Sequence, residues 1–225
     1  MTKPMDEIKD RVAAVVVTYN RAEMLRQCLV SLQKQTMPCD ILVVDNASTD
    51  DTQALVQRAA QHDASIFYRN TGENLGGAGG FNFGMRWAVE AGYAFVWVMD
   101  DDCFPEPVAL EKLLDADRLL QGEYGWLSSV ALWTDGRECR MNRPKIKKNF
   151  YDRIELLRDG ILLAEQATFV SLFLKAETIR AVGLPVKEFF IWGDDIEYTR
   201  RITIRGKMPC YVCLLYTSDA ADDLI

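Results

Sequence analysis

The class of fold follows from one stretch, Val12-Ala13-Ala14-Val15-Val16-Val17-Thr18-Tyr19-Asn20. Its apolar part has no polar residue at alternate positions, which is typical of a strand buried on both faces in a parallel sheet. The run ends in polar residues, and the spacing of the apolar residues after it predicts an amphipathic helix over residues 21–35. A strand followed directly by a helix indicates an α/β unit.

The same alternation continues along the first half of the chain. Apolar runs predict strands at Ile41–Val44, Ile66–Arg69 and Ala94–Met99, with helices at Thr52–Gln61 (capped by Ser48 or Asp50) and Gly80–Ala91. We therefore predict an α/β fold with a mostly parallel sheet flanked by helices. Ligands bind outside the carboxyl ends of such strands, so the polar ends Tyr19-Asn20, Asp45-Asn46 and Asp100-Asp101-Asp102 indicate a nucleotide-type site at one edge.

The second half is less regular. We predict strands at Trp126–Trp133 and Ala167–Leu174, and helices at Glu106–Leu120, Lys175–Val182 and Asp194–Arg205. No repeat and no linker divides the chain, so one domain is expected. The basic segment Arg137–Lys148 could contact a membrane surface or a phosphorylated acceptor, although a solvated loop is the favoured interpretation.

Composition excludes several classes of protein. The formal charge of −7 argues against a nucleic-acid binder, whose footprint would be basic. No apolar run approaches the roughly 20 residues needed to span a bilayer, and the charged stretch Met1–Arg11 lacks the apolar core of a signal peptide. The 6 cysteines are scattered, which favours reduced thiols. We expect a cytoplasmic protein.

The acidic cluster Asp100-Asp101-Asp102 follows the apolar run Phe95–Met99. Adjacent carboxylates repel one another, and an oxygen-preferring divalent cation, Mn²⁺ or Mg²⁺, would remove that penalty and bridge to a diphosphate. Alternate residues of an extended segment share a side, so Asp100 and Asp102 are expected to face the metal while Asp101 faces elsewhere. A solvated acidic turn is the alternative, and the apolar run favours the metal site.

A glycine-rich segment lies upstream, at Asn74-Leu75-Gly76-Gly77-Ala78-Gly79-Gly80. Glycines let the backbone approach a ligand closely, and the helix that follows favours anions. The segment fits neither the dinucleotide fingerprint nor a P-loop. A bare flexible turn is the alternative to the sugar or phosphate contact that we predict here.

A second acidic cluster is contained in Trp192-Gly193-Asp194-Asp195-Ile196-Glu197. Helix capping would account for one of the aspartates but not for both followed by a glutamate. A carboxylate in a partly apolar pocket beside Trp192 could act as a general base toward a hydroxyl.

In this order, these motifs resemble those of the inverting glycosyltransferases of family 2, which have the GT-A nucleotide-sugar-binding fold. The glycine segment and the aspartate triplet look most like the galactofuranosyltransferase and rhamnosyltransferase branch. The resemblance covers roughly residues 11–212. It implies transfer from a nucleoside-diphosphate sugar, first UDP-galactofuranose and second dTDP-rhamnose, to a glycan or polyprenyl-diphosphate-linked acceptor in cell-envelope polysaccharide synthesis. Peripheral association with the inner face of the plasma membrane would suit such an acceptor.

The resemblance also implies roles for individual residues. Asp195 would be the catalytic base, and Asp194 and Trp192 would contact the acceptor. Asp100 and Asp102 would ligate the metal ion. The nucleotide and donor sugar would be held by Thr18, Asn20, Asp45, Asn74, Gly76, Gly77, Gly79, Gly80 and Asp101.

The sequence departs from the family in one respect. The family usually supplies a histidine metal ligand after the second acidic cluster, and none stands there. We expect a GT-A domain over residues 1–213, incomplete at its C-terminus, and a non-native tail over residues 214–225. A non-catalytic nucleotide-sugar-binding fragment is therefore one alternative. A nucleotidyltransferase is another, but it would need a glycine-containing basic loop after the first strand.

Overall fold

A computed structural model describes residues 11–206 and 208–219, with the backbone alone over 214–219. The strands are β1 (Val12–Thr18), β2 (Asp40–Asp45), β3 (Ile66–Asn70), β4 (Phe95–Asp100), β5 (Cys103–Pro105), β6 (Leu127–Trp133), β7 (Lys145–Ile146), β8 (Ile161–Gln166), β9 (Leu172–Lys175) and β10 (Cys210–Asp219). The α-helices are α1 (Ala22–Gln33), α2 (Thr52–His62), α3 (Gly76–Glu90), α4 (Ala109–Leu119), α5 (Ala176–Val182) and α6 (Asp194–Arg200). Short helical turns are η2 (Arg140–Asn142), η3 (Phe150–Asp159), η4 (Lys187–Phe189) and the π-turn η5 (Arg201–Arg205).

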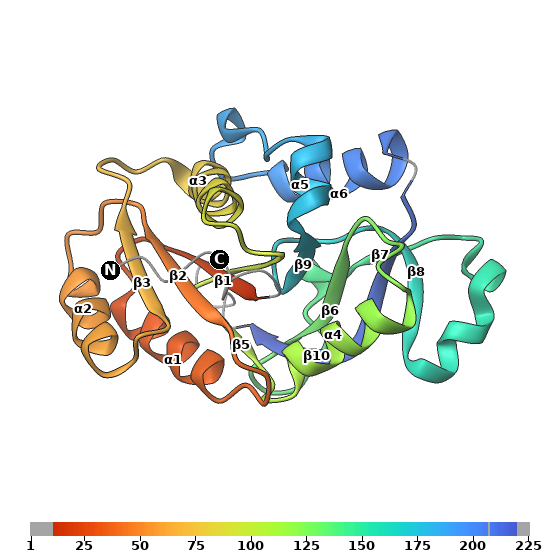
Figure 1. Cartoon of the computed structure of the whole chain (residues 1–225), viewed down its shortest axis with the longest axis horizontal. Helices are drawn as coiled ribbons and strands as arrows, with labels where there is room; N and C mark the ends of the chain where they lie inside the picture. Colours follow the sequence, from red (N-terminus) through yellow and green to blue (C-terminus); the bar gives the residue numbers. More distant parts are fainter. Residues whose placement is uncertain (1–10, 207, 220–225) are drawn as a thin grey trace.

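The strands form one sheet with the order β3-β2-β1-β4-β9-β6-β10-β8-β7, and β5 pairs with β10 (Figure 1). The predicted α/β class is confirmed. The sheet is parallel from β3 to β4, whereas β9 is antiparallel to both β4 and β6. The prediction of a mostly parallel sheet thus applies to the first half. Several strands of the second half are joined without a helix between them, and parallel neighbours need such crossovers.

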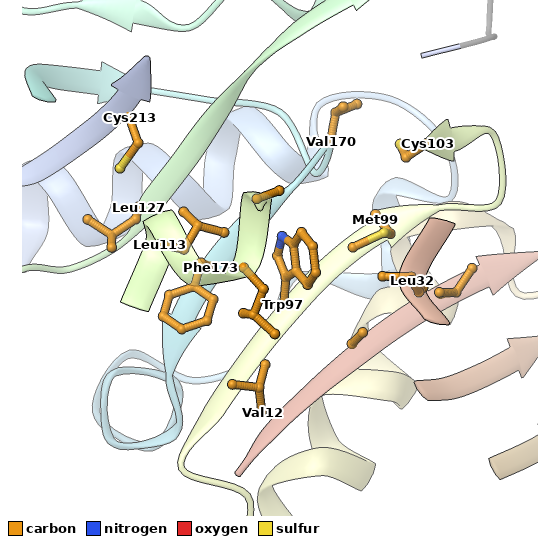
Figure 2. Close-up of a cluster of buried hydrophobic side chains, with 14 of the residues drawn as sticks. Val12, Leu32, Trp97, Met99, Cys103, Leu113, Leu127, Val170, Phe173 and Cys213 are labelled. Atoms are coloured by element: carbon orange, nitrogen blue, oxygen red, sulfur yellow. The ribbon is translucent and has the colours of Figure 1, made fainter. Parts of the chain in front are cut away.

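Alternate residues of β1 serve two cores, one on each face of the sheet. Ala14 and Val16 belong to the core that contains residues of α1, α2 and α4, whereas Val15 and Val17 belong to the core that contains residues of α3, α5 and α6. Figure 2 shows part of the first core, where Trp97 and Met99 of β4 lie among side chains from helices and neighbouring strands. Burial on both faces explains the unbroken apolar pattern of the strand.

The predicted elements of the second half differ from the observed ones in two places. The strand predicted over Ala167–Leu174 is observed only from Leu172 onward, as β9. The residues before it form a loop in which Ser171 has a φ of 55°. The helix predicted over Asp194–Arg205 changes to a π-turn after Arg200. There Trp126 Nε1 donates to the carbonyl of Thr199 at 3.1 Å and Thr203 Oγ1 donates to the same carbonyl at 2.7 Å, which displaces the regular ladder.

Strand β10 crosses the domain boundary predicted at residue 213. Its backbone pairs in parallel with β6 and antiparallel with β8, and the register with β6 shifts between Cys213 and Tyr216. This pairing does not test the predicted non-native origin of residues 214–225, of which 220–225 lie outside the described residues. In the part of the chain that the structure describes, no helix has both the length and the apolar character to cross a bilayer.

The glycine-rich segment is the start of a helix, not the loop expected before Gly80. A Cβ on Gly80 would lie 2.5 Å from Val17 Cγ1, and one on Gly84 would lie 2.3 Å from Val15 Cγ1. These glycines therefore let α3 lie directly on β1. Gly77 differs from them, since a Cβ there would meet no atom within 4 Å.

Replacing Gly84 with alanine should destabilise the protein although alanine favours helix by about 1 kcal/mol. The added methyl would overlap the β-branched Val15, which is fully buried, so we expect a net loss of about 1–3 kcal/mol. Gly77→Ala is the matched control and should be neutral or stabilising. Urea denaturation measures both, and a Gly84→Ala protein as stable as Gly77→Ala would contradict the close approach.

Candidate functional site

The polar ends of three strands meet at one edge of the sheet, as predicted. Thr18 is paired with Asp45 across β1 and β2, and Val17 is paired with Asp100 across β1 and β4. The register thus places the first acidic cluster beside the end of β1, although Thr18 and Asp101 are 83 positions apart in the chain.

Arg21 joins the two carboxylates that follow β4. Its Nη1 donates to Asp101 Oδ1 at 3.0 Å and to Asp102 Oδ2 at 2.7 Å, and Thr18 Oγ1 donates to Asp101 Oδ2 at 2.6 Å. Burial raises the pKa of Asp101 to about 6, with a contribution from the Asp102 charge, while the bonds from Thr18 and Arg21 act in the opposite direction. Burial would lower the pKa of Arg21, but the two carboxylates raise it overall.

The expected alternation of the aspartates is wrong in this structure. Asp101 and Asp102 both reach Arg21, because β4 ends at Asp100 and the next two residues form a turn. Two-residue alternation holds only along an extended strand. No role was predicted for Arg21, and its position directly after the polar end of the first strand, Tyr19-Asn20, was the available signal.

The donor set suits an oxygen-preferring divalent cation. Mg²⁺ and similar ions take one or two carboxylates from a protein and complete their shell with water and phosphate oxygens. Asp100 and Asp102 fit that chemistry, but Asp102 is engaged with Arg21. Among the described residues no group of three or more His, Cys, Asp or Glu side chains could hold a metal ion. Metal binding here stays a prediction.

Asp45 is fully buried and holds the loop after β2. Its Oδ1 accepts a bond from the Ser48 amide at 2.8 Å, and its Oδ2 accepts one from the Tyr68 hydroxyl at 2.6 Å. Burial, and then the bond to Asp45, raise the pKa of Tyr68 to about 12. The carboxylate thus shapes the site edge, and its predicted contact with the nucleotide remains untested by these bonds.

Two loops at the edge are bonded to each other. Asn20, with a φ of 55°, accepts a bond from the Thr49 amide at 2.7 Å, and its own amide donates to Ser48 Oγ at 2.8 Å. Asp50 accepts bonds from the amides of Ala22 and Thr52, the first residues of α1 and α2. Asp50 thus bonds to the first amide of α2, as a cap would, although the N-cap position itself is Asp51. It also bonds to the first amide of α1, which was not predicted.

The glycine-rich segment connects the end of β2 to the loop that precedes the second acidic cluster. Asn46 Nδ2 donates to the carbonyl of Gly76 at 3.0 Å, and the amide of Ala78 donates to the carbonyl of Phe190 at 3.0 Å. Gly76 has a φ of 69°, and a Cβ on it would lie 2.2 Å from the Phe190 oxygen. Asn74 Oδ1 accepts a bond from the Gly76 amide. Asn46 Oδ1 is buried and has no hydrogen-bond partner among the described residues.

These contacts assign a packing role to several predicted ligand residues. Gly76 allows contact with Phe190, Gly79 makes room for Leu75, and Gly80 makes room for Val17. Only Gly77 of the predicted set has open space above its Cα. Their predicted contacts with a donor stay predictions.

The second acidic cluster begins α6 after Gly193, which has a φ of 86°. Asp194 is 6% exposed, and burial raises its pKa. Burial, together with the Asp194 charge, raises the pKa of Asp195 to about 6, against the bond that its Oδ1 accepts from the Ile196 amide. Trp192 is 75% exposed, so it does not enclose the carboxylates as the predicted apolar wall would.

Comparisons with known proteins agree with the fold and the motifs. Residues 13–119 match the family model "Glycosyl transferase family 2". The chain is 32% identical to galactofuranosyltransferase GlfT1 of Mycobacterium tuberculosis over 91% of its own length and 68% of that protein. It is 31% identical to undecaprenyl-phosphate mannosyltransferase of Micrococcus luteus, covering 88% of this chain and 79% of the relative.

Two solved structures share the fold at low sequence identity. The crystal structure of GalNAc-T7 with UDP, GalNAc and Mn²⁺ superposes with a TM-score of 0.74 at 12% identity, over 93% of this chain and 43% of the other. The S. aureus TarS 1–349 structure gives 0.67 at 17% identity, over 93% and 60%. The chain thus spans less than two thirds of these solved chains.

Removing the Arg21 charge should leave Asp101 and Asp102 without their counter-ion. We expect Arg21→Met to lower stability at pH 8 by about 1–3 kcal/mol, a range reduced because the arginine is partly solvated. A carboxyl whose folded pKa is raised destabilises the folded state as pH rises through that pKa. Without Arg21 the pKa of Asp101 should lie higher still, because the guanidinium lowers it. The loss should therefore begin to shrink above pH 6 and be smallest below about 6, where Asp101 is protonated in both proteins.

Arg26→Met is the matched control on α1, the helix that Arg21 precedes, since Arg26 pairs with Glu23 on the exposed surface. It should change stability little and without this pH dependence. Denaturation at pH 8 and below pH 6 measures both variants. Equal losses for the two arginines at both pH values would contradict the ion-pair assignment.

Proposed function

The chain belongs to glycosyl transferase family 2, and on that premise we propose that it transfers a sugar from a nucleoside-diphosphate donor to a glycan or lipid-linked acceptor with inversion. The observation that carries the proposal is the convergence of Thr18, Asp101 and Arg21 at the sheet edge, linked through the start of α3 to the loop before Asp195. In this proposal the donor groups and the acceptor-side base belong to segments that these hydrogen bonds connect.

The donor would bind at the carboxyl ends of β1, β2 and β4. Thr18, Asn20 and Asp45 would face the nucleoside, and Asp101 the donor sugar. Asp100 and Asp102 would hold Mn²⁺ or Mg²⁺, which when bound stabilises the negative charge of a nucleoside diphosphate. Arg21 is a second positive group at the same place. UDP-galactofuranose is the first donor proposed, since GlfT1 is a galactofuranosyltransferase, and dTDP-rhamnose is the second.

The acceptor would bind beside α6. Asp195 would take the proton of an acceptor hydroxyl. The hydroxyl oxygen would then bond to the anomeric carbon of the donor sugar, while the bond from that carbon to the diphosphate oxygen breaks. With a pKa of about 6, its carboxyl is mostly ionised at neutral pH yet more basic than an exposed aspartate. Asp194 would orient the acceptor, and Trp192 would offer an exposed ring for it to pack on.

Relatives support a lipid-linked acceptor. One acts on undecaprenyl phosphate and another is a polyprenol monophosphomannose synthase, by their names. We therefore propose that the protein works in cell-envelope polysaccharide synthesis at the inner face of the plasma membrane, in peripheral association with it.

A nucleotide screen tests the donor side. Thermal shift with UDP and dTDP, each with and without Mn²⁺, should show stabilisation by UDP with Mn²⁺, by about 2.7 kcal/mol at a hundredfold excess over Kd. Asp102→Asn should lose the Mn²⁺-dependent part, whereas Asp115→Asn on the surface of α4 should keep it. Stabilisation by none of the nucleotides would contradict the proposed function.

A transfer assay tests the acceptor side. Asp195→Asn should retain UDP binding and lose about 100-fold or more in kcat/KM, the usual contribution of a general base. Because protonated Asp195 cannot accept a proton, kcat/KM of the unaltered protein should fall about tenfold per pH unit below about 6. A rate that stays level well below pH 6, or a fully active Asp195→Asn protein, would place the base elsewhere. UDP binding without any transfer would indicate a nucleotide-sugar-binding protein.

A further inference from the structure

The loop between α5 and α6 exposes a run of large apolar side chains. Phe189, Phe190, Ile191 and Trp192 are 42%, 49%, 59% and 75% exposed. Single apolar residues are common on protein surfaces, but a contiguous group of this kind marks an interaction site. The loop lies next to α3 at the end of the molecule that also carries α5 and α6 (Figure 1).

The exposure is fixed by the backbone of the loop. The carbonyl of Phe190 accepts the Ala78 amide at 3.0 Å, and the amides of Phe190 and Ile191 donate to the carbonyls of Lys187 and Phe189. Phe190 has a φ of 62°, an uncommon conformation for a bulky residue. These bonds fix the loop in a conformation in which Phe189 and Phe190 are about half exposed, while Ile191 and Trp192 are mostly exposed.

Basic residues lie on the two elements that follow this loop, α6 and the π-turn η5. Both elements line one shallow pocket, formed by Gly193, Ile196, Glu197, Arg200, Arg201, Ile204 and Arg205. The pocket lining, and not a regular helical spacing, brings these side chains together. Arg201 is neutralised by Glu197 at 2.8 Å, whereas Arg200 lies 3.6 Å from Glu165 with its side chain 46% exposed.

Arg205 completes the basic group of the pocket lining. Its side chain is exposed, and it forms no ion pair with any residue in 11–206 or 208–219 that the structure records. Apolar Ile204, itself 51% exposed, stands beside it. The surface therefore combines exposed aromatic and aliphatic groups with Arg205, which has no recorded ion pair within the described part of the chain, and with Arg200, whose long contact with Glu165 leaves it half exposed.

The basic segment Arg137–Lys148 does not offer the same combination. Arg137 pairs with Asp135, Arg143 with Glu138, and Lys145 with Glu165. These pairs balance part of its positive charge, and Met141 is the one large apolar side chain of the segment that the structure shows as exposed. The segment therefore offers basic groups without a run of exposed apolar side chains, and it is the weaker candidate.

We propose that the apolar loop 189–192 and the basic residues from Arg200 to Arg205 dock the protein on a bilayer that carries anionic headgroups. Aromatic and aliphatic side chains enter the interfacial zone, and arginines bind the headgroup phosphates. The inference rests on the proposed lipid-linked acceptor. Because Gly193 connects the loop directly to Asp194 and Asp195, docking places the acceptor-side carboxylates at the membrane surface, where a lipid-linked hydroxyl is presented.

Vesicle co-sedimentation tests the surface with the full chain. Wild-type protein should bind vesicles of phosphatidylcholine mixed with phosphatidylglycerol more tightly than vesicles of phosphatidylcholine alone. The affinity of the double variant Ile191→Ser/Trp192→Ser for the anionic vesicles should be lower by about tenfold or more. The matched control Tyr151→Ser/Ile154→Ser removes exposed apolar groups from η3 and should bind as the wild type does.

The arginines provide a second arm. Arg200→Gln and Arg205→Gln should each weaken binding about fivefold, and added salt should reduce the difference. Arg158→Gln, whose side chain is 82% exposed on η3, should have no effect. Circular dichroism and the thermal midpoint of each variant confirm that it is folded.

Fluorescence quenching gives an independent readout of insertion. Vesicles with brominated acyl chains should quench Trp192, while the buried Trp97 and Trp126 stay unquenched, and Trp192→Phe should remove the effect. The inference is overturned if anionic vesicles are not bound, if the loop variants bind like the wild type, or if an added protein rather than lipid is bound at the loop. UDP binding is measured separately, so failure of the proposed donor function is distinguishable from failure of membrane docking.

Discussion

The candidate site depends on how closely α3 lies on the strands beneath it. Gly80 and Gly84 leave no side chain between the helix and the buried valines of β1. This contact brings the start of α3 to the end of β2, where Asn46 bonds to Gly76, and lets Phe190 bond to Ala78 from the other side. The distance between α3 and β1 therefore sets how the strand ends at the sheet edge and the loop before α6 lie relative to each other. Close interior packing does not allow that distance to vary.

Much of the fold could be predicted from the sequence because β1, β2 and β4 are buried on both faces. Unbroken apolar runs such as Val12–Val17 have few other interpretations, and they locate the polar strand ends as well. The second half lacks that pattern. Its strands are short or irregular, and the split of residues 161–175 into β8 and β9 depends on pairings with β10, β4 and β6 that local sequence does not carry.

The sequence predicted that polar strand ends meet at one edge of the sheet, but it did not predict their contacts. The turn after Asp100 and the bond from Arg21 to both following carboxylates depend on tertiary structure. The roles predicted for the individual site residues stay predictions. The glycines illustrate the same limit. Flexibility and close packing leave the same signature in a sequence, and only the neighbouring Val15, Val17 and Phe190 distinguish them.

Arg21 has a consequence for how the site would fill. A group that takes up Asp102 has to replace an existing guanidinium partner, so binding is an exchange of ions in place of a simple addition. The affinity for the incoming group would then be the difference between two large free energies, that of its new contact with Asp102 and that of the lost contact between Asp102 and Arg21. A bare cation would gain little from such an exchange, whereas a cation that arrives with a diphosphate offers the released guanidinium a new anion. The site would thus favour the joint arrival of metal and nucleotide over either one alone.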